Sequence, residues 1–288
     1  MDNSAKITWV ECPRDAMQGW SRLFSFQEKV DYLQALSVVG FDLLDAGSFV
    51  SPRAIPQMAE TAQVLSAVDW SVGKKPSVLV IVGNQQGAER ALSHEAVDVI
   101  GYPFSLSETF QQRNTNRSRE KALEDIEILA DWSGKAKKEM VVYLSMAFGN
   151  PYGEVIPSGA YVDSLRALKE AGVSTVSISD TIGTGTPDTI YEKAMEAQTV
   201  FPSHQLGLHL HVSPGGAEKA LEAAWNSGIR RFDTAIRGIG GCPYAQDRLV
   251  GNMPSEALLS FLSEKKAVHG VSSDAFEKAY REALHFFT

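Results

Sequence analysis

The regular alternation of short apolar runs with amphipathic helical stretches, along all 288 residues, constrains the fold most. The runs are almost continuously apolar, which is typical of parallel strands that helices cover on both faces. We predict eight strands, at residues 6–12, 41–47, 77–83, 96–104, 139–148, 173–180, 205–212 and 229–236. Helical patterns lie between them, for example at residues 26–40, 118–139 and 214–228.

Eight strand–helix units favour a closed (β/α)₈ TIM barrel over an open doubly wound α/β sheet, which usually has fewer strands. No glycine-rich phosphate-binding motif follows the first strand, and this weakens a dinucleotide-binding interpretation. No linker or low-complexity stretch interrupts the pattern. We therefore predict one TIM-barrel domain over residues 1–288, with an additional C-terminal helix after about residue 268.

The charge balance bears on the partners. The formal net charge is −8, whereas nucleic acid and anionic membranes require a basic surface, so we expect neither as a partner. A small anionic substrate remains compatible, because it responds to the local field of a cleft. Two cysteines, no signal-type start and no apolar run of about 18 residues lead us to expect a cytoplasmic protein.

Polar residues gather where the predicted strands end. The chemistry of TIM barrels lies at the C-terminal ends of the strands and in the loops beyond them. The residues at these places are Arg14, Asp15, Gln18, Asp45, Asn84, Ser107, Asp180, Thr181, His209, His211, Cys242 and Asn252.

His209 and His211 lie two residues apart in a predicted strand, so they point to the same side. One interpretation is two core histidines that bond to backbone carbonyls; the other is a metal site. Together with Asp15 and Asn252 they form a mixed nitrogen and oxygen set that suits Mg²⁺ or Mn²⁺. A closed structural zinc site would use thiolates, although Zn²⁺ or another divalent ion can replace the native cation in a crystal.

Three further residues each have two interpretations. Arg14 forms a surface ion pair with Asp15, or it stabilises an enolate at the barrel mouth. Cys242 is a small buried hydrophobe, or it transfers a proton from an exposed loop. Asp180 ends a strand before a helix N-terminus, or it hydrogen-bonds the substrate.

Several motifs together resemble those of the 3-hydroxy-3-methylglutaryl-CoA (HMG-CoA) lyase family, a pyruvate carboxyltransferase-like branch of the DRE-TIM metallolyases. They occur in family order between residues 7 and 262 and read "PRDAMQ", "GSFVSPRAIPQMAE", "SLSETFQQRNTNRS", "SDTIGTGTP", "HLH", "GIGGCPYA" and "GN". The resemblance implies a metal-dependent, homodimeric TIM barrel that cleaves a 3-hydroxyacyl-CoA into acetyl-CoA and a keto acid.

The resemblance also assigns roles by position. It implies four metal ligands (Asp15, His209, His211 and Asn252) and four catalytic residues (Arg14, Asp45, Asp180 and Cys242). For substrate binding we predict Arg14, Gln18, Asn84, Ser107 and Thr181.

The sequence departs from the family at four places: Gly19-Trp20 after the Arg-Asp motif, Asp45 for a glutamate, Asn150 for a cysteine and Val212 for an aspartate. We therefore expect an oxo-acid lyase that performs retro-Claisen cleavage of HMG-CoA, or of a closely related 3-hydroxyacyl-CoA, to acetyl-CoA and acetoacetate or the matching keto acid. One alternative is an aldolase or condensing enzyme for another 2-oxo acid or acyl thioester. The other is a non-catalytic metal-binding barrel.

Overall fold

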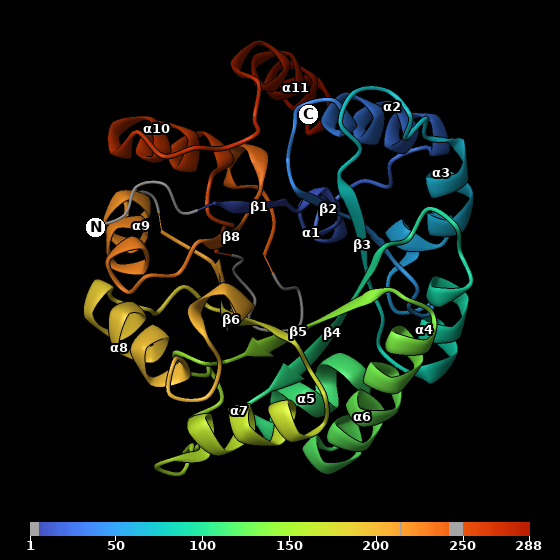
Figure 1. Ribbon diagram of the computed structural model, residues 1–288. Helices are drawn as coiled ribbons and strands as arrows, with labels where there is room; N and C mark the ends of the chain where they lie inside the picture. Colours follow the sequence, from blue (N-terminus) through green and yellow to red (C-terminus); the bar gives the residue numbers. More distant parts are fainter. Residues whose placement is uncertain (1–5, 214, 242–249) are drawn as a thin grey trace.

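Eight parallel strands close into a barrel in chain order, with β8 paired to β1 (Figure 1). The computed structural model describes residues 6–213, 215–241 and 250–288. The strands are β1 (Thr8–Glu11), β2 (Leu43–Ser48), β3 (Ser77–Ile81), β4 (Val99–Ser105), β5 (Glu139–Ser145), β6 (Thr175–Asp180), β7 (Leu206–Leu210) and β8 (Arg231–Thr234). The predicted TIM barrel is confirmed.

Helices form a ring outside the barrel (Figure 1). The α-helices are α1 (Pro13–Gln18), α2 (Phe26–Ser37), α3 (Thr61–Ala67), α4 (Gln85–Leu92), α5 (Glu108–Thr115), α6 (Arg119–Lys135), α7 (Ala160–Glu170), α8 (Pro187–Ala197), α9 (Ala217–Asn226), α10 (Ser255–Lys265) and α11 (Ser273–Phe286). Single 3₁₀ turns occupy η1 (Pro56–Met58), η2 (Ser203–Gln205) and η3 (Ile236–Gly238). The three helices predicted between strands correspond to α2, α6 and α9.

Two apolar layers hold this arrangement together. The larger one lies between the strands and the helix ring, and in β7 it includes Leu206, Leu208 and Leu210. A smaller cluster, which includes Val10, Leu79 and Val141, fills the inside of the barrel. Because strand side chains alternate, the intervening residues of β7 point inward, and this alternation sends the polar side chains at the strand ends into the barrel mouth.

The additional C-terminal helix is also confirmed. The Phe286 ring at the end of α11 stacks on Phe24, with ring centroids 3.9 Å apart, and on Tyr32 of α2 at 4.4 Å. Helix α2 itself begins with a capping box, in which Ser25 and Glu28 each accept a hydrogen bond from the other's backbone N–H. Helix α11 therefore closes the apolar side of α2.

None of the helices in the described part of the chain combines the length and the apolar character that a membrane crossing requires.

Candidate active site

The first part of the site comes from α1, which begins directly after β1 with Pro13 in its first turn. This short helix places the buried side chains of Arg14 and Asp15 at the barrel mouth. Nη1 of Arg14 lies 2.8 Å from Oδ1 of Asp15 and also donates to Oε1 of Gln18 at 3.1 Å. Nε and Nη2 of Arg14 donate to the carboxylate of Asp45, with the Nη2 bond 2.5 Å long. Arg14 is thus held between two carboxylates.

These contacts fix the charges. Burial by itself disfavours charge on Arg14, but Asp45 and Asp15 raise the pKa of its guanidinium above its usual range. Burial opposes ionisation of Asp15 too, yet Arg14 and the two histidines lower its pKa well below normal. Burial raises the pKa of Asp45 to about 6, against the pull of Arg14. At neutral pH the cluster therefore consists of one cation between two carboxylates.

The second part of the site is the histidine pair. His209 faces inward from β7 and His211 directly follows that strand, and their Nε2 atoms lie 3.3 Å apart. One oxygen of Asp15 and one ring nitrogen from each histidine lie within 4.8 Å of one another. Burial and the neighbouring His209 lower the pKa of His211 to about 4, so this ring is neutral at pH 7. Two converging imidazole nitrogens beside a carboxylate fit a divalent cation, which binds the deprotonated form of each ligand.

Asn252, in the segment between β8 and α10, completes this cluster. An antiparallel bridge joins it to His211, and its Nδ2 donates to Oδ2 of Asp15 at 2.8 Å. Gly240 passes so close that a Cβ there would lie 2.2 Å from Nδ2 of Asn252, and its φ of +124° is one that other residues rarely adopt. The structure thus brings together the four side chains predicted as metal ligands.

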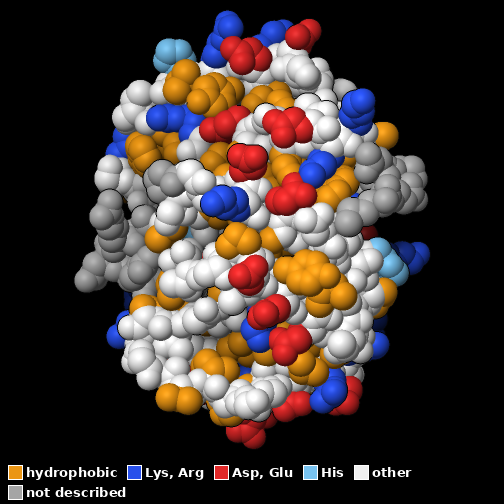
Figure 2. Space-filling view, turned by 90° about the vertical axis from the view of Figure 1, so that its left-hand side faces the viewer, with side chains coloured by type: hydrophobic (Ala, Val, Ile, Leu, Met, Phe, Trp, Pro, Cys, Tyr) orange, Lys and Arg blue, Asp and Glu red, His pale blue; other side chains and the backbone are white. Residues whose placement is uncertain are grey.

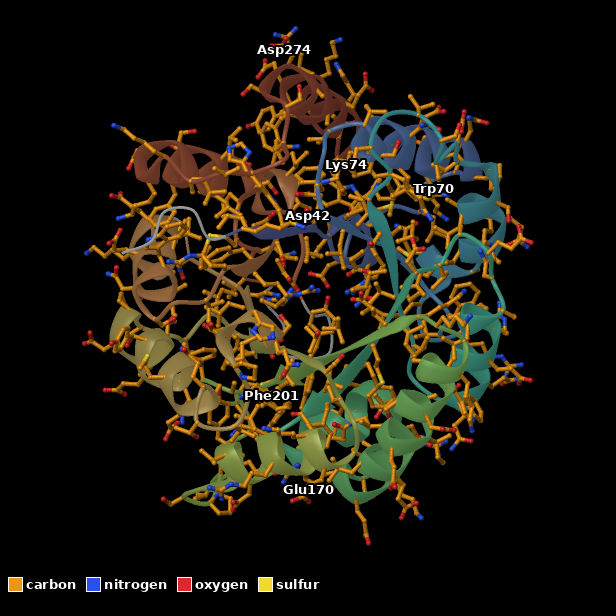
Figure 3. The ribbon with its side chains drawn as sticks, viewed as in Figure 1. Asp42, Trp70, Lys74, Glu170, Phe201 and Asp274 are labelled. Atoms are coloured by element: carbon orange, nitrogen blue, oxygen red, sulfur yellow. The ribbon has the colours of Figure 1, made fainter. Side chains whose placement is uncertain are left out.

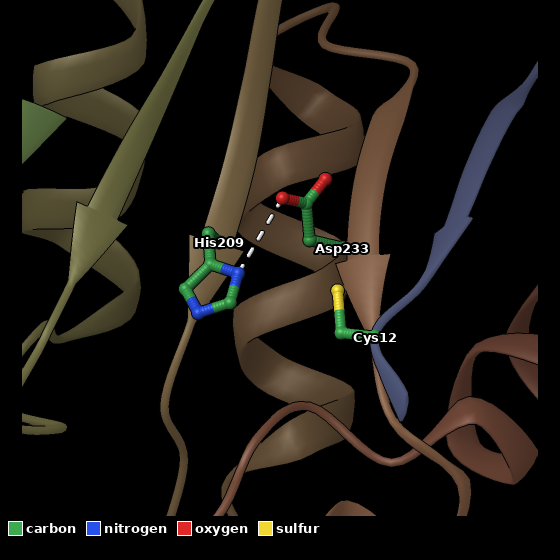
Figure 4. Close-up of side chains that lie close together, drawn as sticks. All are labelled: Cys12, His209 and Asp233. Atoms are coloured by element: carbon green, nitrogen blue, oxygen red, sulfur yellow. Dashed lines mark ion pairs between the residues drawn. The ribbon is translucent and has the colours of Figure 1, made fainter. Parts of the chain in front are cut away.

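A carboxylate that the sequence analysis did not single out supports His209 from inside the barrel. Oδ2 of Asp233, on β8, lies 3.4 Å from Nδ1 of His209 (Figure 4). Asp233 raises the pKa of His209, against the effect of burial. One signal in the sequence could have revealed it: Asp233 is an acidic residue within a predicted buried strand, and that strand follows the one that carries the histidines.

Cys12 joins His209 and Asp233 in a second group with metal-ligand spacing (Figure 4). Burial raises the pKa of the Cys12 thiol well above normal, which disfavours the thiolate form in the free protein. In this arrangement Nδ1 of His209 faces Asp233, and Nε2 faces Asp15 and His211. This is the usual carboxylate–histidine support of a metal site.

A cavity of about 120 Å³ opens over these residues. Its polar lining includes the predicted substrate-binding residues Arg14, Gln18 and Thr181. Tyr143, Ser145 and Ser179 also line it and were missed, because a continuously apolar strand pattern does not reveal which residues face the interior. The lining also includes a set of apolar side chains, namely Val50, Ala54, Ile55, Ile81 and Phe110.

Three predicted site residues point elsewhere. The Asp180 carboxylate accepts hydrogen bonds from the N–H groups of Thr184 and Gly185 in the loop before α8, at 3.1 and 2.7 Å. The side chains of Asn84 and Ser107 are the N-caps of α4 and α5. None of the three lines the cavity as far as the structure describes the chain, so their catalytic or binding roles stay predictions.

Two further residues singled out in the sequence lie in loops. Cys242 lies outside the described residues. Asn150, which replaces a cysteine of the family, closes its own loop: its Nδ2 donates to the Glu154 carbonyl and its Oδ1 accepts from the N–H groups of Tyr152 and Glu154. The Glu154 side chain then accepts from the Ser107 hydroxyl at the N-terminus of α5. Asn150 therefore stabilises the loop that positions Glu154 against the N-terminus of α5.

A TIM barrel with an aspartate, two histidines and an asparagine at its mouth, and an arginine beside them, has the features of a barrel enzyme with a candidate divalent-metal site. Comparison with known proteins agrees. The HMGL-like family model matches residues 6–281, so the chain belongs to the HMGL-like family.

Named relatives are lyases. The chain is 33% identical over 282 residues to the 3-hydroxy-3-isohexenylglutaryl-CoA/hydroxy-methylglutaryl-CoA lyase of Pseudomonas aeruginosa, covering 97% of this chain and 92% of that protein. It is 32% identical over 261 residues to a hydroxymethylglutaryl-CoA lyase of Bacillus subtilis, covering 90% and 86%. An HMG-CoA lyase from A. baumannii, solved with coenzyme A and 3-methylmalate, superposes with a TM-score of 0.90 at 25% identity, covering 98% of this chain and 91% of that one. The predicted enzyme class, an oxo-acid lyase, is confirmed.

Proposed function

We propose that this chain cleaves HMG-CoA, or a closely related 3-hydroxyacyl-CoA, into acetyl-CoA and acetoacetate or the matching keto acid. The observation that carries the proposal is the direct contact of Arg14 with Asp15, at the place where the Nε2 atoms of His209 and His211 converge. The names of the relatives support the substrate, and the ligands of the A. baumannii structure support a thioester of coenzyme A.

The proposed metal ligands are Asp15, His209, His211 and Asn252. A divalent cation such as Mg²⁺ or Mn²⁺ would supply Lewis acidity toward the hydroxyl and carboxylate oxygens of the substrate. The fit rests on the donor set, which combines two imidazole nitrogens with carboxylate and amide oxygens. Asp233 keeps Nε2 of His209 directed at this point.

The reaction requires the C2–C3 bond of the substrate to break. The hydroxyl proton leaves to a basic side chain, C3 becomes the ketone, and the bonding electron pair moves to C2 as a thioester enolate. Of the proposed ligands that line the cavity, Asp15 is the one with a second oxygen that could accept that proton. A proton then returns to C2 and completes acetyl-CoA, a step for which Cys242 or a site histidine is our proposal.

Arg14 would stabilise the enolate. An arginine has five N–H donors. Arg14 uses Nε and one Nη2 N–H for Asp45, and both Nη1 N–H groups for Asp15 and Gln18. The second Nη2 N–H is left for the substrate, and the two carboxylates hold the guanidinium rigid so that it needs no reorganisation during the reaction. Asp45, which does not line the cavity, is then a positioning residue for Arg14.

A second candidate substrate has a longer alkyl group at C3. The apolar part of the cavity lining, which includes Val50, Ile55 and Phe110, favours this variant of the reaction. The P. aeruginosa relative carries two substrates in its name, one with a methyl and one with an isohexenyl group. Comparing kcat/KM for the two thioesters decides between them.

The direct test incubates purified protein with HMG-CoA and Mg²⁺ or Mn²⁺ and measures acetyl-CoA and acetoacetate. Metal-dependent release of both products, abolished by a chelator, supports the proposal. Turnover of another acyl thioester or 2-oxo acid instead would favour the aldolase alternative. If the protein binds the metal but turns over neither HMG-CoA nor the other thioesters and 2-oxo acids, the non-catalytic barrel is the remaining interpretation.

We further propose that residues 1–288 act as one catalytic domain and that the protein works as a cytoplasmic homodimer. The family match over residues 6–281 supports the first statement. Light scattering of the purified protein and fractionation of cells test the other two.

A further inference from the structure

We propose that this protein has a second ligand site, for a phosphate group, at the opposite end of the barrel from the catalytic cavity. A cavity of about 480 Å³ lies there, and its lining includes Lys6, His204, Leu206, Trp225, Arg230 and Arg231.

The position of the cavity separates it from the catalytic site. Leu206 and Arg231 are the first residues of β7 and β8, and Thr8, which also lines the cavity, is the first residue of β1. The catalytic cluster lies beyond the last residues of the same strands. A ligand bound here would therefore enter from the other end of the barrel.

The charge of the lining is of one sign. Lys6, Arg230 and Arg231 are cationic, and none of the described lining residues is acidic. The chain as a whole has 35 acidic and 27 basic residues. On the face that carries α8, α9 and α10, charged groups of both signs are interspersed (Figure 2). A wholly basic hollow in an acidic protein is a local field that attracts an anion.

Arg231 provides the strongest evidence. Arg231 is only 8% exposed, yet its Nε and Nη2 atoms have no hydrogen-bond partner among the described residues. The nearest carboxylate oxygen, Oδ1 of Asp233, lies 4.0 Å from Nε, which is beyond hydrogen-bonding distance. Both atoms are inaccessible to solvent in this conformation, so a ligand oxygen reaches them only if the Arg231 side chain shifts toward the cavity. Buried donors that stay unpaired cost free energy, and such a shift would recover it.

Gly207 explains how the Arg231 side chain reaches this position. A Cβ at residue 207 would lie 2.7 Å from Cδ of Arg231, so any larger residue on β7 would displace the guanidinium. The glycine on the neighbouring strand thus leaves Arg231 room to lie across the floor of the cavity.

Arg230 is partly committed elsewhere. Its Nη1 donates to the carbonyls of Trp225 and Ile229, at 2.8 Å each, and its guanidinium lies 3.7 Å from the centre of the Trp225 ring. It therefore caps the C-terminus of α9 and adds positive charge to the wall. Lys6 makes no ion pair with a carboxylate in the described part of the chain. Arg231 and Lys6 are thus the donors available to a ligand.

These donors favour phosphate. A planar guanidinium matches two phosphate oxygens, and a lysine adds a point charge. The volume exceeds what inorganic phosphate fills, so the group could be free or carried by a small organic ester. Both sources share the same chemistry, and the experiment separates them.

The test measures Tm of the full chain at constant ionic strength, with chloride replaced stepwise by inorganic phosphate, by AMP or by adenosine. We expect a saturable rise of Tm with AMP, and none with adenosine. A rise with inorganic phosphate as well shows that the free ion suffices. Equal effects of AMP and adenosine, or no effect of either phosphate, would overturn the proposal.

Variants locate the effect. Lys6→Gln should weaken AMP binding about tenfold without altering lyase turnover, and Arg231→Met should abolish binding. The matched control is Lys74→Gln, which removes another exposed lysine at this end of the barrel, one that lies 3.8 Å from Asp42 (Figure 3). Arg14→Met should leave the phosphate effect intact, and saturating coenzyme A should not displace AMP, which together exclude binding in the catalytic cavity. Should Arg231→Met fail to fold, the comparison of Lys6→Gln with Lys74→Gln decides, and equal affinities would refute the site.

Discussion

The Asp233 carboxylate lies 3.4 Å from Nδ1 of His209, inside the barrel and away from the cavity. This relationship joins β8 to the predicted metal site on β7. A carboxylate at Nδ1 holds the proton on that nitrogen and leaves the Nε2 lone pair for a cation. The family aspartate that Val212 replaces is thus not required to give His209 an acidic partner.

Asp233→Asn should reduce Mn²⁺ affinity by about 10- to 100-fold, the usual cost of losing such a partner of a metal-binding histidine. Titration of chelated, apo protein with Mn²⁺, followed by electron paramagnetic resonance, measures this. Asp131→Asn is the control, because Asp131 forms an exposed ion pair with Lys135 on α6. Equal affinities in both variants would show that Asp233 does not support the metal site.

Arg14→Met should lower kcat by about 100- to 1,000-fold, because removal of a preorganised donor to a developing oxyanion typically costs that much. Metal affinity should change little, since Arg14 contacts the ligand Asp15 without being a ligand itself. Parallel turnover and Mn²⁺ titrations test this split. Full activity in Arg14→Met would remove the enolate role that we assign to it.

His211→Ala should lose both functions. The substitution removes one of the two converging Nε2 atoms, so we expect metal affinity and turnover to fall together. Elemental analysis after dialysis, alongside the product assay, measures both. A variant that keeps its stoichiometric metal would exclude His211 from the ligand set.

The fold followed from the sequence because nearly every strand is a continuous apolar run. The candidate metal cluster followed because its members lie near the C-terminal ends of strands or in the segments beyond them. Whether a given side chain points into the barrel or away from it could not be predicted from the sequence. Asp180 ends β6, but Ser177 and Thr181 occupy the inward positions of that register, so Asp180 turns toward the loop N–H groups.

Local hydrogen bonding accounts for the other differences. Asn84 and Ser107 directly precede helices, and their side-chain oxygens accept hydrogen bonds from free N–H groups of the first helical turn. A side chain that caps a helix in this way is not directed at the substrate. Asp233 was hidden for the opposite reason, since its role depends on a pairing between β7 and β8 that no local pattern reveals.

A buried carboxyl outside the barrel makes stability depend on pH. Glu11 is fully buried, and burial raises its pKa to about 8, although Ser255 and the Ile236 N–H lower it. In the unfolded chain this pKa is near 4.5. Between these two values the native state retains a proton that the unfolded state has released, so stability falls as pH rises through this window.

Glu11→Gln should remove that slope, which amounts to about 1 kcal/mol per pH unit. Urea unfolding at pH 5, 6, 7 and 8 measures it, and the variant should gain most over the parent at pH 8. Glu127→Gln, on the exposed side of α6, is the control and should follow the parent. A parent protein whose stability does not decline between pH 5 and 8 relative to Glu11→Gln would contradict the prediction.

The last prediction concerns α11, whose Phe286 ring stacks between Phe24 and Tyr32 and is only 8% exposed. Phe286→Ala should cost about 3–5 kcal/mol, because it removes a large buried ring and leaves a cavity. Leu284→Ala, at a side chain of the same helix that is 41% exposed, should change the free energy of unfolding by no more than about 0.5 kcal/mol. Urea denaturation compares the two variants. If both variants lose the same free energy of unfolding, the aromatic stack of Phe286 does not contribute to the stability of the protein.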